Sequence, residues 1–311
     1  MRTSLFSTGL CVAILLTALP LWAAAAAVPV PTPTVETQYP GLSSGPLRQA
    51  KLVELPQGAL VRTATLTITG KQVTDEIAET SLGVQAQLKK HQFFLLEQMA
   101  VKALLEAEAQ AWARAEKRDA KEDTEAVLRA YIQSIAQKAT VSDDELKAFF
   151  DANKDMLGGV PYDAVKEDLR TYLLQDKQQE AVQAHINTVS IRTAIEVDAT
   201  WMEAQAAKSL DNPVDIARRA GKPAMIDFGA SGCGPCDMME PILKSLQETH
   251  ADRYTILYLD VREEQILAAR YGVETIPVQV FFDTHGKEVF RHVGYFPKEK
   301  ILEQLDALGG K

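Results

Sequence analysis

Two cysteines separated by two residues form the part of this sequence best suited to chemistry. Cys233 and Cys236 enclose Gly234 and Pro235, and an apolar run, Ala224–Phe228, precedes them. An amphipathic stretch follows, so the pattern predicts a strand, a tight turn and a helix whose first turn carries the first thiol. Unpaired backbone N–H groups and the positive end of the helix dipole favour a thiolate at that place. The spacing also allows a disulfide between the two sulfurs, so it indicates reversible two-electron thiol chemistry.

Zinc binding and a purely structural disulfide are the alternative interpretations of this pair. A structural zinc site needs four protein ligands, and the histidines of the region, His250, His285 and His292, lack a matching spacing. A structural disulfide would normally close a longer loop. We therefore expect no metal, no separate cofactor, and a redox-active disulfide between Cys233 and Cys236.

The segment from about Asp211 to Lys311 resembles the thioredoxin family in more than these cysteines. The further matches are Asp227 as the family's buried acid, Pro241 in the active-site helix, Ile276 and a cis Pro277 facing the cysteines, and Gly294 before the last helix. The resemblance implies an α/β thioredoxin fold. The elements expected in order are a helix at Val214–Ala220, the strand and active-site helix, a strand at Tyr254–Val261, a helix at Glu263–Tyr271, a hairpin at His285-Gly286 and a helix from Pro297.

The same resemblance implies a mechanism. Cys233 attacks a substrate disulfide, Cys236 releases the reduced substrate, and Asp227 moves the proton that Cys236 must lose. The residues implied to contact substrate are Gly232, Gly234, Pro235, Ile276, Pro277 and Gly294. Because Gly-Pro between the cysteines is similar to reducing thioredoxins, we expect a reductase or isomerase of protein disulfides, served by an upstream thiol electron donor or acceptor.

Two positions beside the cysteines depart from the family's pattern. Gly232 stands where tryptophan is usual, which opens the surface next to Cys233, and Asp237 stands where lysine or arginine is usual. A carboxylate near a helix start stabilises the helix but opposes thiolate formation nearby. Both departures bear on the redox potential of the pair.

Residues 1–27 have the pattern of a secretory signal. Arg2 supplies positive charge, Leu10–Leu21 is largely apolar, and the run Ala23–Ala27 offers A-x-A cleavage sites. An uncleaved membrane anchor is the alternative, although the apolar stretch is short for a span of about 20 residues. Cys11 would leave with the signal, and the mature chain would keep one CxxC pair. We expect a protein of an oxidising compartment. The style of the signal, together with the family resemblance of residues 53–197 described below, implies that this compartment is the Gram-negative periplasm.

Composition argues against one class of partner, and length leaves room for two domains. The 311 residues carry 33 Lys and Arg against 42 Asp and Glu, a net charge of −9, which argues against nucleic-acid binding. Residues 28–52 are expected to be a Pro-rich linker, of which Val28–Leu47 has the composition of an extended tether. Residues 198–210 should be a connector to the thioredoxin-like domain at 211–311.

Residues 53–197 are expected to form a mainly helical domain with a small two-stranded element. Alternating apolar residues predict one strand at Leu60–Thr69 and a second at Val189–Val197 that pairs with it. Thr74 is the expected N-cap of the first helix. The further helices expected are Val84–Lys117, one marked by Val127, Tyr131 and Ile135, a short one after the capping box at Ser142, and one from about Val165 to Asn187.

This domain resembles the N-terminal domain of SurA-type periplasmic chaperones. The segments that carry the resemblance are LTITGKQVTDEIA, VSDDELKAFFDANKDML and the stretch from Val160 to Val197. Only Gly158 and Gly159 stand where that family commonly has a parvulin domain, so no prolyl isomerase activity is implied. A generic dimerisation or spacer domain is the alternative.

The competing function for the whole protein is a chaperone or adaptor that holds unfolded clients, with an accessory redox domain. The sequence leaves the oligomeric state open.

Overall fold

The computed structural model describes residues 32–43, 45–118, 123–154, 157 and 159–309. The predicted signal at 1–27, its cleavage sites, Cys11 and the start of the linker lie outside the described residues. No helix within the described ranges is both long enough and apolar enough to cross a membrane.

The segment expected to be an extended tether is folded from residue 32 onward, so that prediction is wrong there. Helix α1 (Val35–Gln38) begins with a capping box made by Thr34, and the short 3₁₀ helix η1 (Pro46–Gln49) follows. Val35 and Leu47 are fully buried in the same core as the first sheet. A few apolar residues therefore hold this Pro- and Gly-rich stretch in a defined conformation, because distant parts of the chain pack against them.

A four-stranded sheet brings the two ends of the N-terminal domain together. Its order is β1 (Lys51–Val53), β4 (Glu196–Asp198), β2 (Ala59–Arg62) and β3 (Thr67–Thr69). Val61 lies opposite Val197, which confirms the predicted pairing of the first and last strands. The expected single strand Leu60–Thr69 is instead a hairpin, since the Thr63 side chain accepts two backbone N–H groups and turns the chain. The second expected strand is shorter than predicted.

The helices of this domain follow the predicted order with shifted boundaries. They are α2 (Gly70–Ala78), α3 (Leu82–Lys90), α4 (Gln92–Ala115), α5 (Thr124–Ala136), α6 (Asp143–Ala152), α7 (Tyr162–Arg192) and α8 (Ala199–Ser209).

Four of these boundaries correct the sequence predictions. The N-cap of α2 is Thr69, whose capping box with Gln72 leaves Thr74 inside the helix. The expected helix Val84–Lys117 is divided at the buried His91. Helix α7 continues through the start of the expected strand Val189–Val197. The connector predicted at 198–210 is largely helix α8, because Met202 and Ala206 fill the N-terminal core. The capping box of α6 at Ser142 is confirmed.

The C-terminal region has the predicted thioredoxin fold. Its elements are α9 (Pro213–Arg218), β5 (Ala224–Gly229), α10 (Gly234–Thr249), β6 (Thr255–Asp260), α11 (Gln265–Arg270), β7 (Val278–Phe282), β8 (Glu288–Val293) and α12 (Lys298–Ala307). The sheet order is β6-β5-β7-β8, with β5 parallel to β6 and antiparallel to β7.

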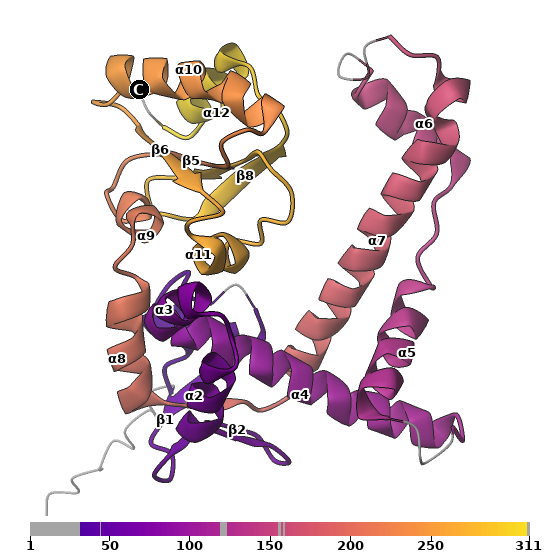
Figure 1. Ribbon diagram of the computed structural model, residues 1–311, viewed down its shortest axis with the longest axis vertical. Coiled ribbons are helices and arrows are strands. Elements are labelled where there is room, and N and C mark those ends of the chain that lie inside the picture. The colour runs from indigo at the N-terminus through magenta and orange to yellow at the C-terminus, as the bar shows by residue number, and fades with distance from the viewer. Residues whose placement is uncertain (1–31, 44, 119–122, 155–156, 158, 310–311) are drawn as a thin grey trace, which may run out of the picture. The chain divides into compact units, whose positions relative to one another are not determined.

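Both faces of this central strand are buried, which explains why β5 is apolar along nearly its whole length. Phe228 packs with residues of α9 and α11 on one face, and Met225 packs with residues of α10 and α12 on the other. The two helix layers lie on opposite sides of the sheet (Figure 1). This arrangement holds the end of β5, where the cysteine turn begins, in a fixed position.

Side-chain contacts join the N-terminal residues to α11. The Gln87 amide donates to the carbonyl of Glu263 at 2.7 Å and accepts from the backbone N–H of Ile266 at 3.0 Å. At the other end of α11, Arg270 donates to the carbonyl of Gly41 at 2.9 Å. Residues 32–311 accordingly form one compact unit.

Candidate functional site

The two cysteines lie where β5 gives way to α10. Cys233 is the N-cap residue of α10 and forms a disulfide with Cys236, with a Cα–Cα distance of 5.2 Å. The backbone N–H of Asp237 donates to the carbonyl of Cys233 at 2.9 Å, which starts the helix at that point. Cys236 is 4% exposed, whereas Cys233 is only half-buried. The first sulfur is therefore the one that an incoming substrate can reach.

The two residues that depart from the family's pattern interact with each other. Gly232 has a φ of +78°, a conformation that favours glycine, and a Cβ there would meet nothing within 4 Å. Its backbone N–H donates to the side chain of Asp237 at 3.3 Å. The carboxylate in the first turn of α10 thus fixes the loop before Cys233. The adjoining positions Gly234 and Pro235 form the exposed start of the helix.

The predicted substrate-binding residues Ile276 and Pro277, just before β7, and Gly294, just after β8, come to the same end of the sheet. The Ile276-Pro277 bond is cis, as the family resemblance implied. Val278, the next residue, lies opposite Phe228 near the end of β5. The backbone N–H of Gly294 donates to the carbonyl of Pro277 at 2.8 Å. Strand register therefore brings these residues to the sheet edge from which the cysteine turn leaves.

Asp227 is fully buried in β5, and both it and the second cysteine lie near Gly229. Its Oδ1 accepts a hydrogen bond from Nε2 of Gln279 at 2.7 Å, and its Oδ2 has no partner. Burial raises the pKa of Asp227 to about 6, and the hydrogen bond from Gln279 opposes that rise. A Cβ built on Gly229 would lie 3.5 Å from both Asp227 Oδ2 and the Cβ of Cys236. The carboxyl group and Cys236 thus face one small space.

Sequence reasoning missed two side chains that enclose this carboxyl group. Gln279 lies opposite Asp227 on β7, and Tyr258 lies opposite it on β6. The ring of Tyr258 comes within 2.9 Å of the same Cβ position on Gly229, so this ring also borders the space. Burial, and then the negative charges of Asp260 and Asp227, raise the pKa of Tyr258. One available signal was the single polar residue in the apolar strand that contains Gln279.

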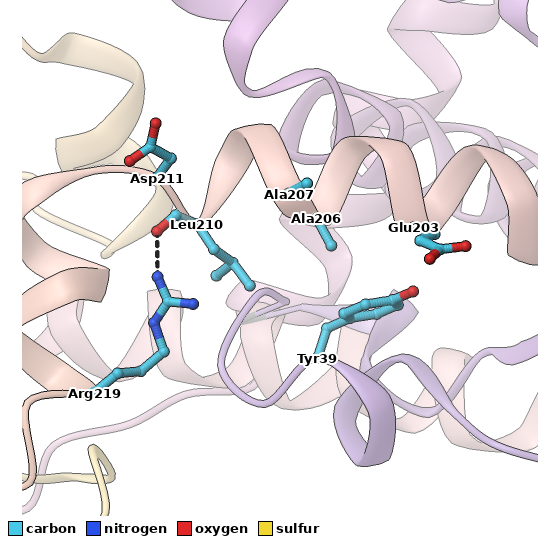
Figure 2. Close-up of a pocket in the computed structure, with 7 residues that line it drawn as sticks. All are labelled: Tyr39, Glu203, Ala206, Ala207, Leu210, Asp211 and Arg219. Carbon is cyan, nitrogen blue, oxygen red and sulfur yellow. Dashed lines mark hydrogen bonds between the residues drawn. The ribbon is translucent and has the colours of Figure 1, made fainter.

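Two cavities in the described part of the chain lie apart from these residues. The smaller, about 340 Å³, is lined by Tyr39, Arg219 and residues of α8 and its C-terminal end. Figure 2 shows the Tyr39 ring beneath α8 and the Arg219 guanidinium at the carbonyl of Leu210, a hydrogen bond of 2.6 Å. The larger, about 1170 Å³, also lacks both cysteines among its lining residues. Neither of these two cavities therefore includes the thiol centre, whose Cys233 is half-buried.

No group of three metal-ligating side chains occurs among the residues that the structure describes. The donor atoms at the cysteine pair are two sulfurs already joined to each other. The arrangement fits a dithiol that opens and closes.

A family model described as thioredoxin-like domain matches residues 210–309. The thioredoxin of Alicyclobacillus acidocaldarius is 39% identical over 89 residues, which are 29% of this chain and 84% of the relative. The chain belongs to the thioredoxin family. The thioredoxin of Staphylococcus aureus is 42% identical over 82 residues, which are 26% of this chain and 78% of that protein.

A solved structure of a mutant thioredoxin from Halobacterium salinarum is 30% identical and covers 30% of this chain and 81% of its own, with a TM-score of 0.29. The family match leaves residues 1–209 outside it. Membership of the thioredoxin family, together with the Cys233–Cys236 disulfide, supports a thiol–disulfide oxidoreductase whose substrates are proteins that contain disulfides.

Proposed function

We propose that this thioredoxin-family chain is an exported reductase or isomerase of protein disulfides. The observation that supports it best is the unequal exposure of a bonded cysteine pair at a helix start. Cys233 is reachable at the N-cap of α10, whereas Cys236 is 4% exposed. The more exposed thiol can attack a substrate disulfide. The buried thiol can reach only the mixed disulfide that then forms on Cys233.

The proposed reaction moves two electrons from the dithiol to the substrate. The Cys233 thiolate attacks one sulfur of a substrate disulfide, the substrate S–S bond breaks, and a mixed disulfide forms. Cys236 then loses its proton and attacks Cys233, which releases the second substrate sulfur as a thiolate. Asp227 is proposed to accept the proton of Cys236 because its unpartnered Oδ2 and the Cβ of Cys236 both lie 3.5 Å from the Cβ position of Gly229. An upstream thiol donor would reduce the Cys233–Cys236 disulfide again.

Substrate binding is proposed along Ile276, Pro277 and Gly294, where an extended peptide can pair with backbone. The helix-start residues Gly232, Gly234 and Pro235 would border the same groove. Large apolar side chains are exposed nearby in the chain: Met238 is 57% exposed, Val293 51% and Tyr295 38%. Apolar contacts of this kind would favour unfolded or partly folded proteins as substrates.

Export to the periplasm, and a SurA-like role for the N-terminal region, remain part of this proposal. Export is supported by the charge, apolar run and alanine run of residues 1–27. The SurA-like role is supported by the sequence segments of residues 60–197. In that role the N-terminal domain would hold a client while its disulfides react at Cys233, without prolyl isomerase activity.

The test of the oxidoreductase is reduction of insulin by full-length protein with dithiothreitol as electron source. We expect catalysis by the wild type, loss to background in Cys233→Ser, and trapped mixed disulfides in Cys236→Ser. The matched control Ser231→Ala removes a neighbouring polar group that is not a thiol and should retain the rate. Equal insulin reduction by wild type and Cys233→Ser would overturn the proposal. Equilibration with glutathione then decides between a reducing and an oxidising direction.

A chaperone or adaptor with an accessory redox domain is the second candidate. The observation that favours it is the exposure of large apolar residues on the helical region: Leu82 is 84% exposed, Ile191 77% and Tyr172 54%. A protein with Cys233→Ala and Cys236→Ala separates the two functions. If that variant suppresses aggregation of an unfolded client as well as the wild type does, the holding function is independent of the thiols.

A further inference from the structure

We propose that Gln279 is a positioning residue that holds the carboxyl group of Asp227 by its Oδ1, leaves Oδ2 free near Gly229 and Cys236, and keeps the group in its proton-accepting form. This inference rests on the proposed function and adds a residue that the cysteine motif does not contain. Gln279 does not touch the reacting sulfurs in this argument; it acts through Asp227.

Strand register makes the contact between the two side chains. Gln279 on β7 lies directly opposite Asp227 on β5, and both side chains are fully buried. The Gln279 Nε2 donates to Oδ1 of Asp227 at 2.7 Å. Since one oxygen is held, the orientation of the carboxyl plane is fixed and the other oxygen, Oδ2, is left to accept a proton. That oxygen borders the same space as Cys236, next to Gly229.

The side-chain amide of Gln279 is the group near Asp227 that stabilises the negative charge of its carboxylate. Tyr258 from β6 and Cys236 from α10 are the titratable side chains that face it, and neither carries positive charge. Asp237 and Glu240 on α10 add negative charge on the side of Tyr258. No salt bridge to Asp227 occurs in the described ranges. The charged form of a buried carboxyl group without a cation depends on hydrogen-bond donors, and Gln279 supplies one.

The consequence concerns the resolving step. The S–H bond of Cys236 breaks and an O–H bond forms at Oδ2 of Asp227. The electron pair left on Cys236 then forms the bond to Cys233, while the mixed disulfide breaks and its electron pair leaves on the substrate sulfur. The dithiol is oxidised and the substrate disulfide is reduced by two electrons. Only the deprotonated carboxylate of Asp227 can accept the proton in this step. The fraction of Asp227 in that form therefore limits the reaction rate at low pH.

The experiment compares Gln279→Met with the wild type and with the control Gln247→Met, whose amide instead donates to the carbonyl of Ile256. The rate of insulin reduction is measured from pH 5 to pH 9. The lower midpoint of the rate profile should rise by about one pH unit in Gln279→Met and stay unchanged in the control. The rate of the variant should approach that of the wild type above the new midpoint. An unchanged or lowered midpoint, or an equal loss at every pH, overturns the proposal.

A second measurement uses the wild type alone and so does not depend on folding of the variant. In the oxidised protein, the side-chain amide resonance of Gln279 should titrate with a midpoint near the pKa of Asp227, about 6, and the titration should vanish in Asp227→Asn. A resonance that does not move overturns the inference. If the wild type reduces no protein disulfide, the proposed function fails, while this titration still decides whether Gln279 controls Asp227.

Discussion

Arg270 and Asp215 form a buried ion pair between α11 and α9, with 2.6 Å between Nη1 and Oδ2. Their side chains are 4% and 2% exposed. Arg270 also donates to the carbonyls of Gly41 and Leu42, so the pair joins the thioredoxin domain to the segment before the first sheet. Arg218 on α9 pairs with Asp215 at 3.0 Å and donates to the carbonyl of Gly41 at 3.3 Å, so two guanidinium groups join these segments.

Replacing Arg270 with methionine should lower the free energy of unfolding by about 1.5–3 kcal/mol, because it removes charge-assisted hydrogen bonds to the buried Asp215, which keeps Arg218 at 3.0 Å as its other cation. Denaturant unfolding of the full chain measures it. Arg129→Met is the matched control, since Arg129 pairs with Glu125 on the exposed surface of α5. We expect the control to change stability by less than about 1 kcal/mol. A similar effect from both substitutions would show that burial of the pair contributes nothing.

Cys233 should react with an alkylating reagent about tenfold faster than Cys236 in the reduced protein near neutral pH. The reason is its half-buried position at the N-cap of α10, against the 4% exposure of Cys236. The single-thiol variants Cys236→Ser and Cys233→Ser report the two rates separately. Equal rates would remove the basis for assigning Cys233 as the nucleophile.

Replacing Asp227 with asparagine should stabilise the oxidised protein and slow its reaction. Burial raises the pKa of Asp227 from 3.8 to about 6, so the folded protein binds this proton more tightly than the unfolded chain does. Stability of the wild type therefore falls as the pH rises between those values, and above them the charged group costs the fold on the order of 3 kcal/mol.

Unfolding at pH 4 and pH 7 tests this expectation. Asp227→Asn should match the wild type at the lower pH and exceed it at the higher one, whereas the exposed control Asp252→Asn should follow the wild type at both. An equal response of the two variants to pH would contradict the assignment. Insulin reduction by Asp227→Asn at pH 7 should be slower, because the proton acceptor of the resolving step is lost.

A fragment of about Asp211–Lys311 should fold and reduce a small disulfide, with lower stability than the full chain. Removal of the N-terminal residues uncovers Ile266, which packs against their core, and takes the carbonyl partners from Arg270. If the N-terminal region holds clients, the fragment should lose more activity on a scrambled protein than on the small disulfide. Equal losses would make that region a structural support, and no loss on either substrate would make it a spacer or dimerisation element.

The sequence was sufficient to predict the redox motif and the order of elements around it. A largely apolar strand that contains Asp227, two closely spaced cysteines and a helix with Pro241 form a local pattern, and the structure has these elements in place. The cis bond at Ile276-Pro277 is also confirmed. These features depend on residues close together in the chain or on a strong family resemblance, so they can be predicted from the sequence alone.

Features that depend on distant partners could not be predicted in this way. The Pro- and Gly-rich residues before β1 have the composition of a tether, yet the backbone N–H of Leu47 donates to Glu97 on α4 at 3.2 Å. Glu97 also bonds to Ser43 and is itself buried. Gln279 was missed for the same reason, since its role depends on its register opposite Asp227. The composition of a segment does not show which distant residues will pack against it.

Tyr258 connects the buried carboxyl group with the protein surface. Its ring lies 2.9 Å from the Cβ position of Gly229, which Asp227 Oδ2 and Cys236 also border, yet 43% of the residue is exposed. The same ring is thus a wall of the buried acid's surroundings and part of the solvent-facing side of β6, a strand separate from the cysteine turn.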